Sequence, residues 1–171
     1  MKIKQLNIKG CYLINFKAHK DHRGYFKRDF CKKEFTKFNI NTKWVQSSVS
    51  LNKKRGTLRG FHFQKKPFQE DKLIGCVKGS FVDYILDLRK NSKTFMKIIK
   101  VKLSENKYSS VFIPKGCAHG FLTLENDTII TYLMSNFHSK KHESSISFFD
   151  KRFKINFPIK PKYISKRDLK T

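Results

Sequence analysis

The segment Arg55-Gly-Thr-Leu-Arg-Gly-Phe-His-Phe-Gln64 alternates as a β-strand does and places an arginine, a histidine and a glutamine among aromatic side chains. A strand of this kind can hold a base and an anion-binding residue on one rigid element. Strict alternation, however, puts His62 on one face of the strand and Arg59 on the other. Either a bulge near Gly60 turns Arg59 toward His62, or the site extends around the strand.

The rest of the chain continues this pattern of short apolar runs separated by Gly, Pro, Asn or Asp. Strands are expected over 11–16, 43–50, 73–78, 81–88, 96–103, 110–113, 118–124 and 128–134, with further apolar segments at 146–149 and 153–157. One short helix is expected over about 30–38, capped by Asp29, with Phe30, Phe35 and Phe38 pointing inward. Many strands and one helix favour an all-β barrel or sandwich.

Two connections are read as hairpin turns. Gly79-Ser80 separates runs 73–78 and 81–88, and Asp83 shares one face of the second run with apolar residues, so that face lines a polar cavity or is exposed. At Asn126-Asp127, a two-residue turn places His119 on the same face as Tyr132, whereas a three-residue turn directs it away.

The 171 residues are expected to form a single domain, spanning 1–171, that can bury a core without disulfides. The four cysteines are scattered without a C-x-x-C spacing, which favours reduced, buried thiols. The N-terminus lacks the apolar core of a signal peptide, and no apolar run is long enough to span a bilayer. A soluble, cytoplasmic protein is therefore expected.

The net charge of +25 comes mostly from lysines that are spread along the whole chain. We find no helix-turn-helix, zinc-finger or aromatic RNA-binding signature, so nucleic acid is expected to bind only non-specifically. A positive field of this size would also attract phosphorylated small molecules.

Four segments carry a more specific signal: Gly56-Thr-Leu-Arg-Gly-Phe-His-Phe-Gln64, Lys72-Leu73, Pro114-Lys-Gly-Cys-Ala-His-Gly-Phe121 and Ile164-Ser-Lys-Arg-Asp168. In their order and spacing they resemble the dTDP-4-dehydrorhamnose 3,5-epimerase family, and the resemblance covers nearly the whole chain. The family consists of cupin-like jelly rolls that act on nucleotide-linked 4-keto sugars. The resemblance therefore implies a cupin-like jelly-roll barrel with a short helix or two.

The resemblance implies a role for each matching residue. His62 would be the catalytic base, Asp168 would orient it, and Tyr132 would be the general acid. The implied substrate-binding residues are Arg23, Phe26, Gln46, Arg59, Lys72, Asp83, His119, Phe137 and Glu143. Because Arg23 and Phe26 match contacts that the family supplies from a neighbouring subunit, a homodimer is implied.

This chemistry needs those residue types. A C4 ketone acidifies the hydrogens on C3 and C5, because the carbanion delocalises as an enolate. A neutral imidazole can take such a proton, Lys72 can stabilise the enolate oxygen, and a tyrosine can return a proton from the opposite face, particularly if nearby positive charge lowers its pKa. No metal or cofactor is required, and His62 lacks the second histidine of the H-x-H pair usual in metal-binding cupins.

Three positions depart from the family pattern: Arg28 replaces a usual glutamate, Ser48 an asparagine, and Phe137 a tyrosine. The expected reaction is inversion of C3 and C5 of a dTDP-4-keto-6-deoxy-hexose, on the route to L-rhamnose or a related surface sugar. An enzyme that inverts one centre or uses another nucleotide carrier is the nearest alternative. A non-catalytic basic module that binds nucleic acid or other polyanions is an alternative of a different class.

Overall fold

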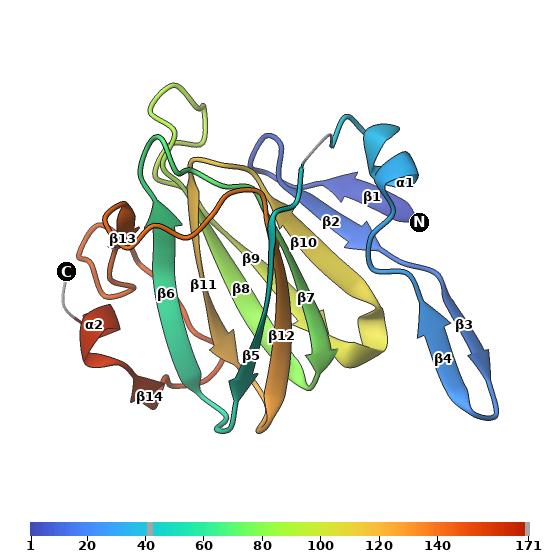
Figure 1. Cartoon of the computed structure of the whole chain (residues 1–171). Coiled ribbons are helices and arrows are strands. Elements are labelled where there is room, and N and C mark those ends of the chain that lie inside the picture. The colour runs from blue at the N-terminus through green and yellow to red at the C-terminus, as the bar shows by residue number, and fades with distance from the viewer. Residues whose placement is uncertain (41–42, 170–171) are drawn as a thin grey trace.

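The computed structural model describes residues 1–40 and 43–169, and it contains two β-sheets that share an apolar core (Figure 1). The first, here called the Tyr132 sheet, has the strand order β1 (Lys2–Gln5), β2 (Tyr12–Asn15), β10 (Ser109–Ile113), β7 (Lys72–Lys78), β12 (Thr128–Met134) and β5 (Gln46–Asn52). The second, the His62 sheet, has the order β13 (Glu143–Ser145), β6 (Thr57–Gln64), β11 (Cys117–Thr123), β8 (Ser80–Asp87) and β9 (Ile98–Ser104), with β14 (Tyr163–Ile164) beside β6.

The remaining elements lie outside the two sheets. They are the hairpin of β3 (Ala18–Asp21) and β4 (Gly24–Lys27), the helices α1 (Lys32–Thr36) and α2 (Lys166–Leu169), and the 3-10 turn η1 (Glu105–Lys107). This arrangement confirms the predicted all-β, jelly-roll class with two short helices. No helix within the described residues is long and apolar enough to cross a membrane.

The main core lies between the sheets. Ile74 and Val111 from the Tyr132 sheet pack with Ile85 and Phe121 from the His62 sheet, and all four are almost completely buried. Burying one such side chain contributes roughly 1.5–3 kcal/mol. This core closes one part of the space between the sheets and leaves the part beside Tyr132 open as a cavity.

A second apolar core covers the outer face of the His62 sheet. Leu58, Phe61 and Tyr84 point away from the inter-sheet core and pack against the C-terminal part of the chain. The ring of Phe61 stacks on that of Phe148, with 4.0 Å between centroids. Because this packing draws the C-terminal segment along β6, residues 163–169 are brought beside His62.

Both predicted hairpins are wrong. β7 pairs with β10 and β12, whereas β8 pairs with β9 and β11, so the chain crosses between sheets at Gly79, whose φ is +74°. The Asn126-Asp127 connection likewise joins β11 of one sheet to β12 of the other, which excludes both registers considered. Every residue of β8 is buried, because β9 and β11 flank its two edges and an apolar core covers each of its two faces.

Helix α1 is shorter than expected. Cys31 occupies the N-cap position, whereas Asp29 forms an ion pair with Lys27, so the predicted Asp29 cap is wrong. Phe35 is buried as expected, but Phe38 is exposed, because the helix ends before it. The apolar segment at 146–149 forms no strand, since β13 ends at residue 145.

Candidate active site

A cavity of about 380 Å³ opens between the two sheets. Its lining comes from β5, β7 and β12 of the Tyr132 sheet, from β6 and β11 of the His62 sheet, and from two loops. The lining residues are Gln46, Ser48, Val49, Ser50, Arg59, His62, Glu70, Lys72, His119, Gly120, Phe121, Tyr132, Met134 and His138. Across residues 1–40 and 43–169, no three His, Cys, Asp or Glu side chains gather in a way that could hold a metal ion.

His62 and Asp168 form a hydrogen-bonded pair at the edge of this cavity. The Nε2 atom of His62 lies 2.7 Å from Oδ1 of Asp168, and the Asp168 side chain is only 5% exposed. Burial raises the pKa of Asp168, but hydrogen bonds from His62, Ser165 and the Gly60 backbone outweigh it and lower that pKa below its ordinary value. A carboxylate that accepts from Nε2–H leaves the lone pair of neutral His62 on Nδ1.

The local fold explains how Asp168 reaches β6 from the end of the chain. β14 runs parallel to the start of β6, where Ile164 lies opposite Leu58, and α2 follows directly. The backbone N–H of Asp168 donates to the Ser165 hydroxyl at 3.1 Å. Chain ends fray unless they are tied down, and these contacts hold the C-terminal segment against the strand that carries His62.

A bulge at Gly60 places Arg59 and His62 on the same cavity. The pairing of β6 with β11 shifts register between His119 and Phe121, opposite Gly60, and Gly60 has a φ of +115°. A Cβ at Gly60 would lie 2.4 Å from the Cα of Gly120, so only glycine permits this close approach. The bulge alternative is therefore confirmed.

Tyr132 enters the cavity from the opposite sheet. It lies in β12, which is paired on both sides, with β5 and β7. Its ring centroid is 6.1 Å from that of His119, across the inter-sheet space rather than along a hairpin. Burial and the nearby Asp83 raise the pKa of Tyr132, while the Arg59 charge and a hydrogen bond from Ser50 lower it less, so the phenol stays protonated. Positive charge from Arg59 does lower this pKa, but the net shift is upward.

Lys72 is held at the cavity wall by a carboxylate. Its Nζ atom lies 3.2 Å from Oε1 of Glu70, and both side chains are nearly buried. The second oxygen of Glu70 accepts from the Gln64 side chain at 3.1 Å. The cavity therefore contains an ammonium group that is paired with a carboxylate, and this carboxylate is itself held by Gln64.

Asp83 and His119 form a buried pair behind the cavity surface. Oδ1 of Asp83 lies 3.3 Å from Nδ1 of His119, and Asp83 is fully buried. Burial raises the pKa of Asp83 well above its ordinary value, although Lys72 opposes the shift. Burial, with the charges of Lys72 and His62, lowers the pKa of His119 well below its ordinary value. A neutral carboxyl can donate to Nδ1, which leaves Nε2–H of His119 as a donor.

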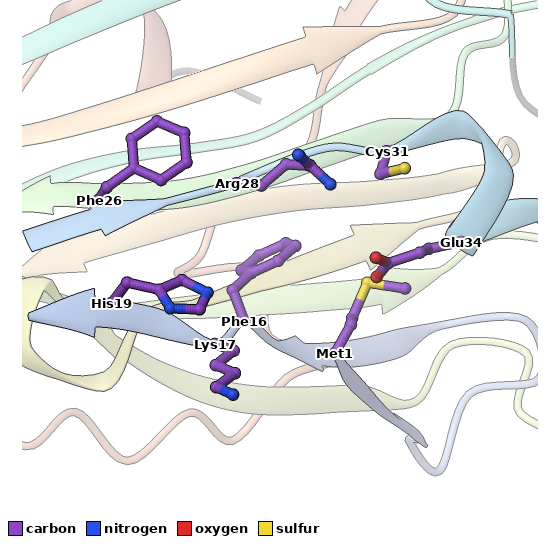
Figure 2. A pocket seen from close by; sticks show the side chains of 8 residues that line it. All are labelled: Met1, Phe16, Lys17, His19, Phe26, Arg28, Cys31 and Glu34. Carbon is purple, nitrogen blue, oxygen red and sulfur yellow. The ribbon is translucent and has the colours of Figure 1, made fainter.

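Two predicted binding residues lie far from this cavity in the chain's own fold. Arg23 and Phe26 belong to the β3–β4 hairpin, which projects away from the sheets (Figure 1). Arg23 is paired with Asp21, and Phe26 is 68% exposed. Phe26 and Arg28 line a different, smaller pocket of about 210 Å³ at the base of the hairpin (Figure 2).

Of the other predicted residues, Gln46 lines the cavity, whereas Glu143 and Phe137 do not. The Gln46 side chain accepts from the backbone N–H of His138 at 2.6 Å. Glu143 accepts from Nε2 of His138 at 3.0 Å and pairs with Arg167 at 3.1 Å. Phe137 is 60% exposed and does not line the cavity.

Sequence reasoning missed several residues that the fold brings to the site. Glu70, Ser50 and His138 line the cavity, and His138 also pairs with Glu143. Ser50 offered a signal, because it alternates with Gln46 and Ser48 along one strand. Glu70 lies in a loop, where alternation gives no face, and no local signal identified it.

Comparisons with known proteins agree with this geometry. Residues 5–171 match the family model described as dTDP-4-dehydrorhamnose 3,5-epimerase. A dTDP-4-dehydrorhamnose 3,5-epimerase from Sinorhizobium fredii is 36% identical over 164 residues, which cover 96% of this chain and 84% of the relative.

Solved structures show the same likeness. The crystal structure of dTDP-4-dehydrorhamnose 3,5-epimerase from Bacillus anthracis with TDP and PPi bound superposes with a TM-score of 0.94 at 35% identity, covering 98% of this chain and 95% of that one. A 3'-monoepimerase from Streptomyces bikiniensis in complex with dTDP-quinovose has a TM-score of 0.89 at 28% identity, covering 96% and 83%.

Proposed function

The chain belongs to the dTDP-4-dehydrorhamnose 3,5-epimerase family, and we propose that it inverts C3 and C5 of a dTDP-4-keto-6-deoxy-hexose by removing and returning protons beside the C4 ketone. The observation that carries the proposal is that His62 and Tyr132 reach one cavity from opposite sheets. Inversion needs this arrangement, because a proton must leave one face of the sugar and another must arrive at the opposite face.

His62 is proposed as the base. Its hydrogen bond to Asp168 supports this role, because the carboxylate favours the tautomer with the lone pair on Nδ1 and stabilises the imidazolium formed when a proton is taken. Tyr132 is proposed as the acid, since burial keeps its phenol protonated at neutral pH.

The enolate formed between these two steps needs positive charge or donors at its oxygen. Lys72 is proposed to supply the charge, and its contact with Glu70 restrains the ammonium group in the cavity. His119 is proposed to add a donor through Nε2–H, with Asp83 holding the ring from behind. Such preorganised groups lose little energy to reorganisation as charge develops.

The nucleotide end of the substrate is proposed to lie toward Arg59 and Gln46, at the open side of the cavity. Arg59 is exposed and can bind the diphosphate, and the charge of +25 favours encounter with this anion. Because Arg28 and Ser48 depart from the family pattern, the nucleotide base of the substrate is not determined. Assays of the purified enzyme with dTDP-, UDP- and GDP-linked keto sugars would identify this base.

A homodimer is proposed as the assembly. Support comes from the exposed Phe26 on the projecting hairpin and from the exposed apolar residues Val49, Leu51 and Val77 on the Tyr132 sheet. In such a dimer, Arg23 and Phe26 would reach the partner's nucleotide site. Light scattering should give twice the mass of 20.3 kDa, and a monomeric mass would contradict the proposal.

Location in the cytoplasm is also proposed. The support is chemical: Cys11, Cys31, Cys76 and Cys117 are all free thiols, which is typical of proteins in a reducing compartment. Three of the four are buried, as expected, and Cys31 is half-buried.

The reaction can be tested by incubating the protein with a dTDP-4-keto-6-deoxy-hexose in D2O and following the product by NMR. Deuterium at C3 and C5 with inversion at both carbons is expected. Deuterium at one carbon would support an enzyme that inverts a single carbon, like the 3'-monoepimerase from Streptomyces bikiniensis. No deuterium from any nucleotide-linked keto sugar would refute an epimerase.

A further inference from the structure

Glu70 places a carboxylate in a cavity whose proposed substrate is an anion. It lines the inter-sheet cavity, and its side chain is only 10% exposed. A carboxylate buried in this way loses hydration, and without a partner it would repel the enolate that the reaction forms. On the proposed function, on which this inference rests, the charge that stabilises the enolate comes from Lys72, and Lys72 is the partner of Glu70.

Lys72 needs a partner because of its own chemistry. A lysine ammonium is a compact charge at the end of a flexible four-carbon stem, so it does not hold one position unaided. Its Nζ atom lies 3.2 Å from Oε1 of Glu70, and its side chain is 12% exposed. Such a charge stabilises an enolate best if it is already in place when the proton leaves. The position of the Glu70 carboxylate therefore sets the position of the charge.

Gln64 holds the second oxygen of the same carboxylate. Nε2 of Gln64 donates to Oε2 of Glu70 at 3.1 Å, and Gln64 is buried at the end of β6. Oε1 of Gln64 accepts from the backbone N–H of Ser139 at 2.7 Å, and its Nε2 also lies 3.1 Å from the backbone oxygen of Phe137. The backbone thereby orients this amide so that its NH2 group, and not its oxygen, faces Glu70.

The backbone next to Glu70 is also held. The N–H of Asp71 donates to the hydroxyl of Ser135 at 2.7 Å, and the N–H of Ser135 donates to the backbone oxygen of Asp71 at 3.1 Å. Oδ1 of Asp71 accepts from the backbone N–H of Lys115 at 2.8 Å. These contacts do not involve the side chain of Lys72, so the fold places Glu70 independently of the ammonium group that it binds.

Only a carboxylate can serve both neighbours of residue 70. Glu70 accepts from an ammonium group through one oxygen and from an amide N–H through the other. A glutamine here would have one acceptor oxygen and one NH2 group, so it would turn a donor toward either Lys72 or Gln64. The negative charge and the two acceptor oxygens are therefore both used.

From these contacts we propose that Glu70 is a positioning residue for the reaction, which acts by holding the ammonium group of Lys72 at the cavity wall where the enolate oxygen forms. Glu70 neither takes nor gives a proton. The C4 ketone of the bound sugar carries little charge, whereas the enolate carries a full one. Correct placement of Lys72 therefore stabilises the transition state more than the bound substrate, and its loss lowers kcat more than it raises KM.

The first test compares Glu70→Gln with Glu125→Gln. Glu125 lies outside the cavity and accepts from the hydroxyl of Ser80, a contact that an amide oxygen can replace. Inversion of a dTDP-4-keto-6-deoxy-hexose is followed by NMR in D2O over a range of substrate concentrations. Glu70→Gln should lower kcat by roughly 10- to 100-fold and change KM by less than about threefold, whereas Glu125→Gln should match the wild type.

The second test asks whether Glu70 acts through Lys72. Lys72→Met keeps an apolar stem of similar length and removes the charge, and its slow exchange is measured with enzyme and substrate at equal concentration. Adding Glu70→Gln to Lys72→Met should cause no further loss, because there is no ammonium group left to position. The double variant may even react faster than Lys72→Met, since it also removes an unpaired carboxylate from the cavity.

Three results would overturn the role of Glu70. They are a wild-type kcat in Glu70→Gln, a rise in KM without a fall in kcat, and an equal loss from Glu70→Gln with and without Lys72. The third would show that the effect of Glu70 does not pass through Lys72. Absence of deuterium in the product of the wild-type protein would instead refute the proposed function itself.

Discussion

The two sheets contribute opposite halves of the site, and they hold their contributions in different ways. In the His62 sheet, the side chain of the proposed base is 36% exposed and is oriented by Asp168, 106 residues away, through a two-residue parallel strand and a four-residue helix. In the Tyr132 sheet, the proposed acid lies within a strand that is paired along its length on both sides. The orientation of the proposed base (the base side) therefore depends on the C-terminal segment, whereas the position of the proposed acid (the acid side) depends on strand pairing within the sheet.

This difference has a chemical consequence. A base that meets solvent can exchange protons freely, whereas a covered acid keeps its proton until the enolate forms. Placing the two groups on separate sheets also fixes the distance between them by sheet packing, which side-chain motion changes little. The following substitutions test each side of the comparison separately, beginning with the largest expected effect.

Replacing His62 should remove the base side altogether. His62→Asn is expected to lower deuterium incorporation at both carbons by about 10³-fold, within the range attributed to general bases. NMR in D2O measures the loss. His142→Asn, at a histidine that stacks on Phe68 away from the cavity, is the matched control and should stay close to wild type. Exchange by His62→Asn at the wild-type rate would refute the assignment of the base.

Replacing Tyr132 should disable the acid side while leaving the base side working. Tyr132→Phe is expected to lower inversion by about 10²-fold. Exchange with retention should persist, because His62 can return a deuteron to the face from which it took the proton. Product stereochemistry by NMR distinguishes the two. Tyr12→Phe, on β2 of the same sheet, serves as control. If Tyr132→Phe lost exchange together with inversion, proton removal by His62 would not be independent of Tyr132.

Replacing Asp168 tests how far the base side depends on the end of the chain. Asp168→Asn should lower activity by roughly 10-fold or more, less than loss of the base itself. Because the pKa of folded Asp168 is lowered, its carboxylate stabilises the fold above the ordinary value of 3.8, and this contribution is lost as pH falls through the lowered pKa. Thermal unfolding should show wild type more stable than Asp168→Asn at pH 6, with the difference shrinking below about pH 4. A difference that grows toward low pH would contradict the assignment.

Much of the site was predictable because its residues lie in distinctive local patterns. The run Gly56–Gln64 identified both His62 and the difficulty with Arg59, and glycine at position 60 was the correct location for a bulge. Tyr132 and Asp168 were identified by family motifs. Glu70 was missed, because its importance comes from contact with Lys72 and Gln64, and a loop position has no periodicity to mark it.

The predicted strand pairing failed for a related reason. Alternation along residues 81–88 correctly separated the face of Tyr84 from that of Asp83, but it did not show which strands cover each face. Both predicted hairpins joined neighbours in sequence, whereas the chain crosses between sheets at Gly79 and again at Asn126-Asp127. His119 and Tyr132 do meet, but across the core.

Read alone, the sequence predicted the all-β class from local alternation and turn residues, and it predicted the candidate site residues from motifs that resemble those of the family. It did not establish which of those residues touch. That outcome depended on burying both faces of β8, which draws the C-terminal segment over the His62 sheet and carries Asp168 to within 2.7 Å of His62. Apolar burial acts over any separation in sequence, so the meeting of residues 62, 132 and 168 is a property of the packed sheets.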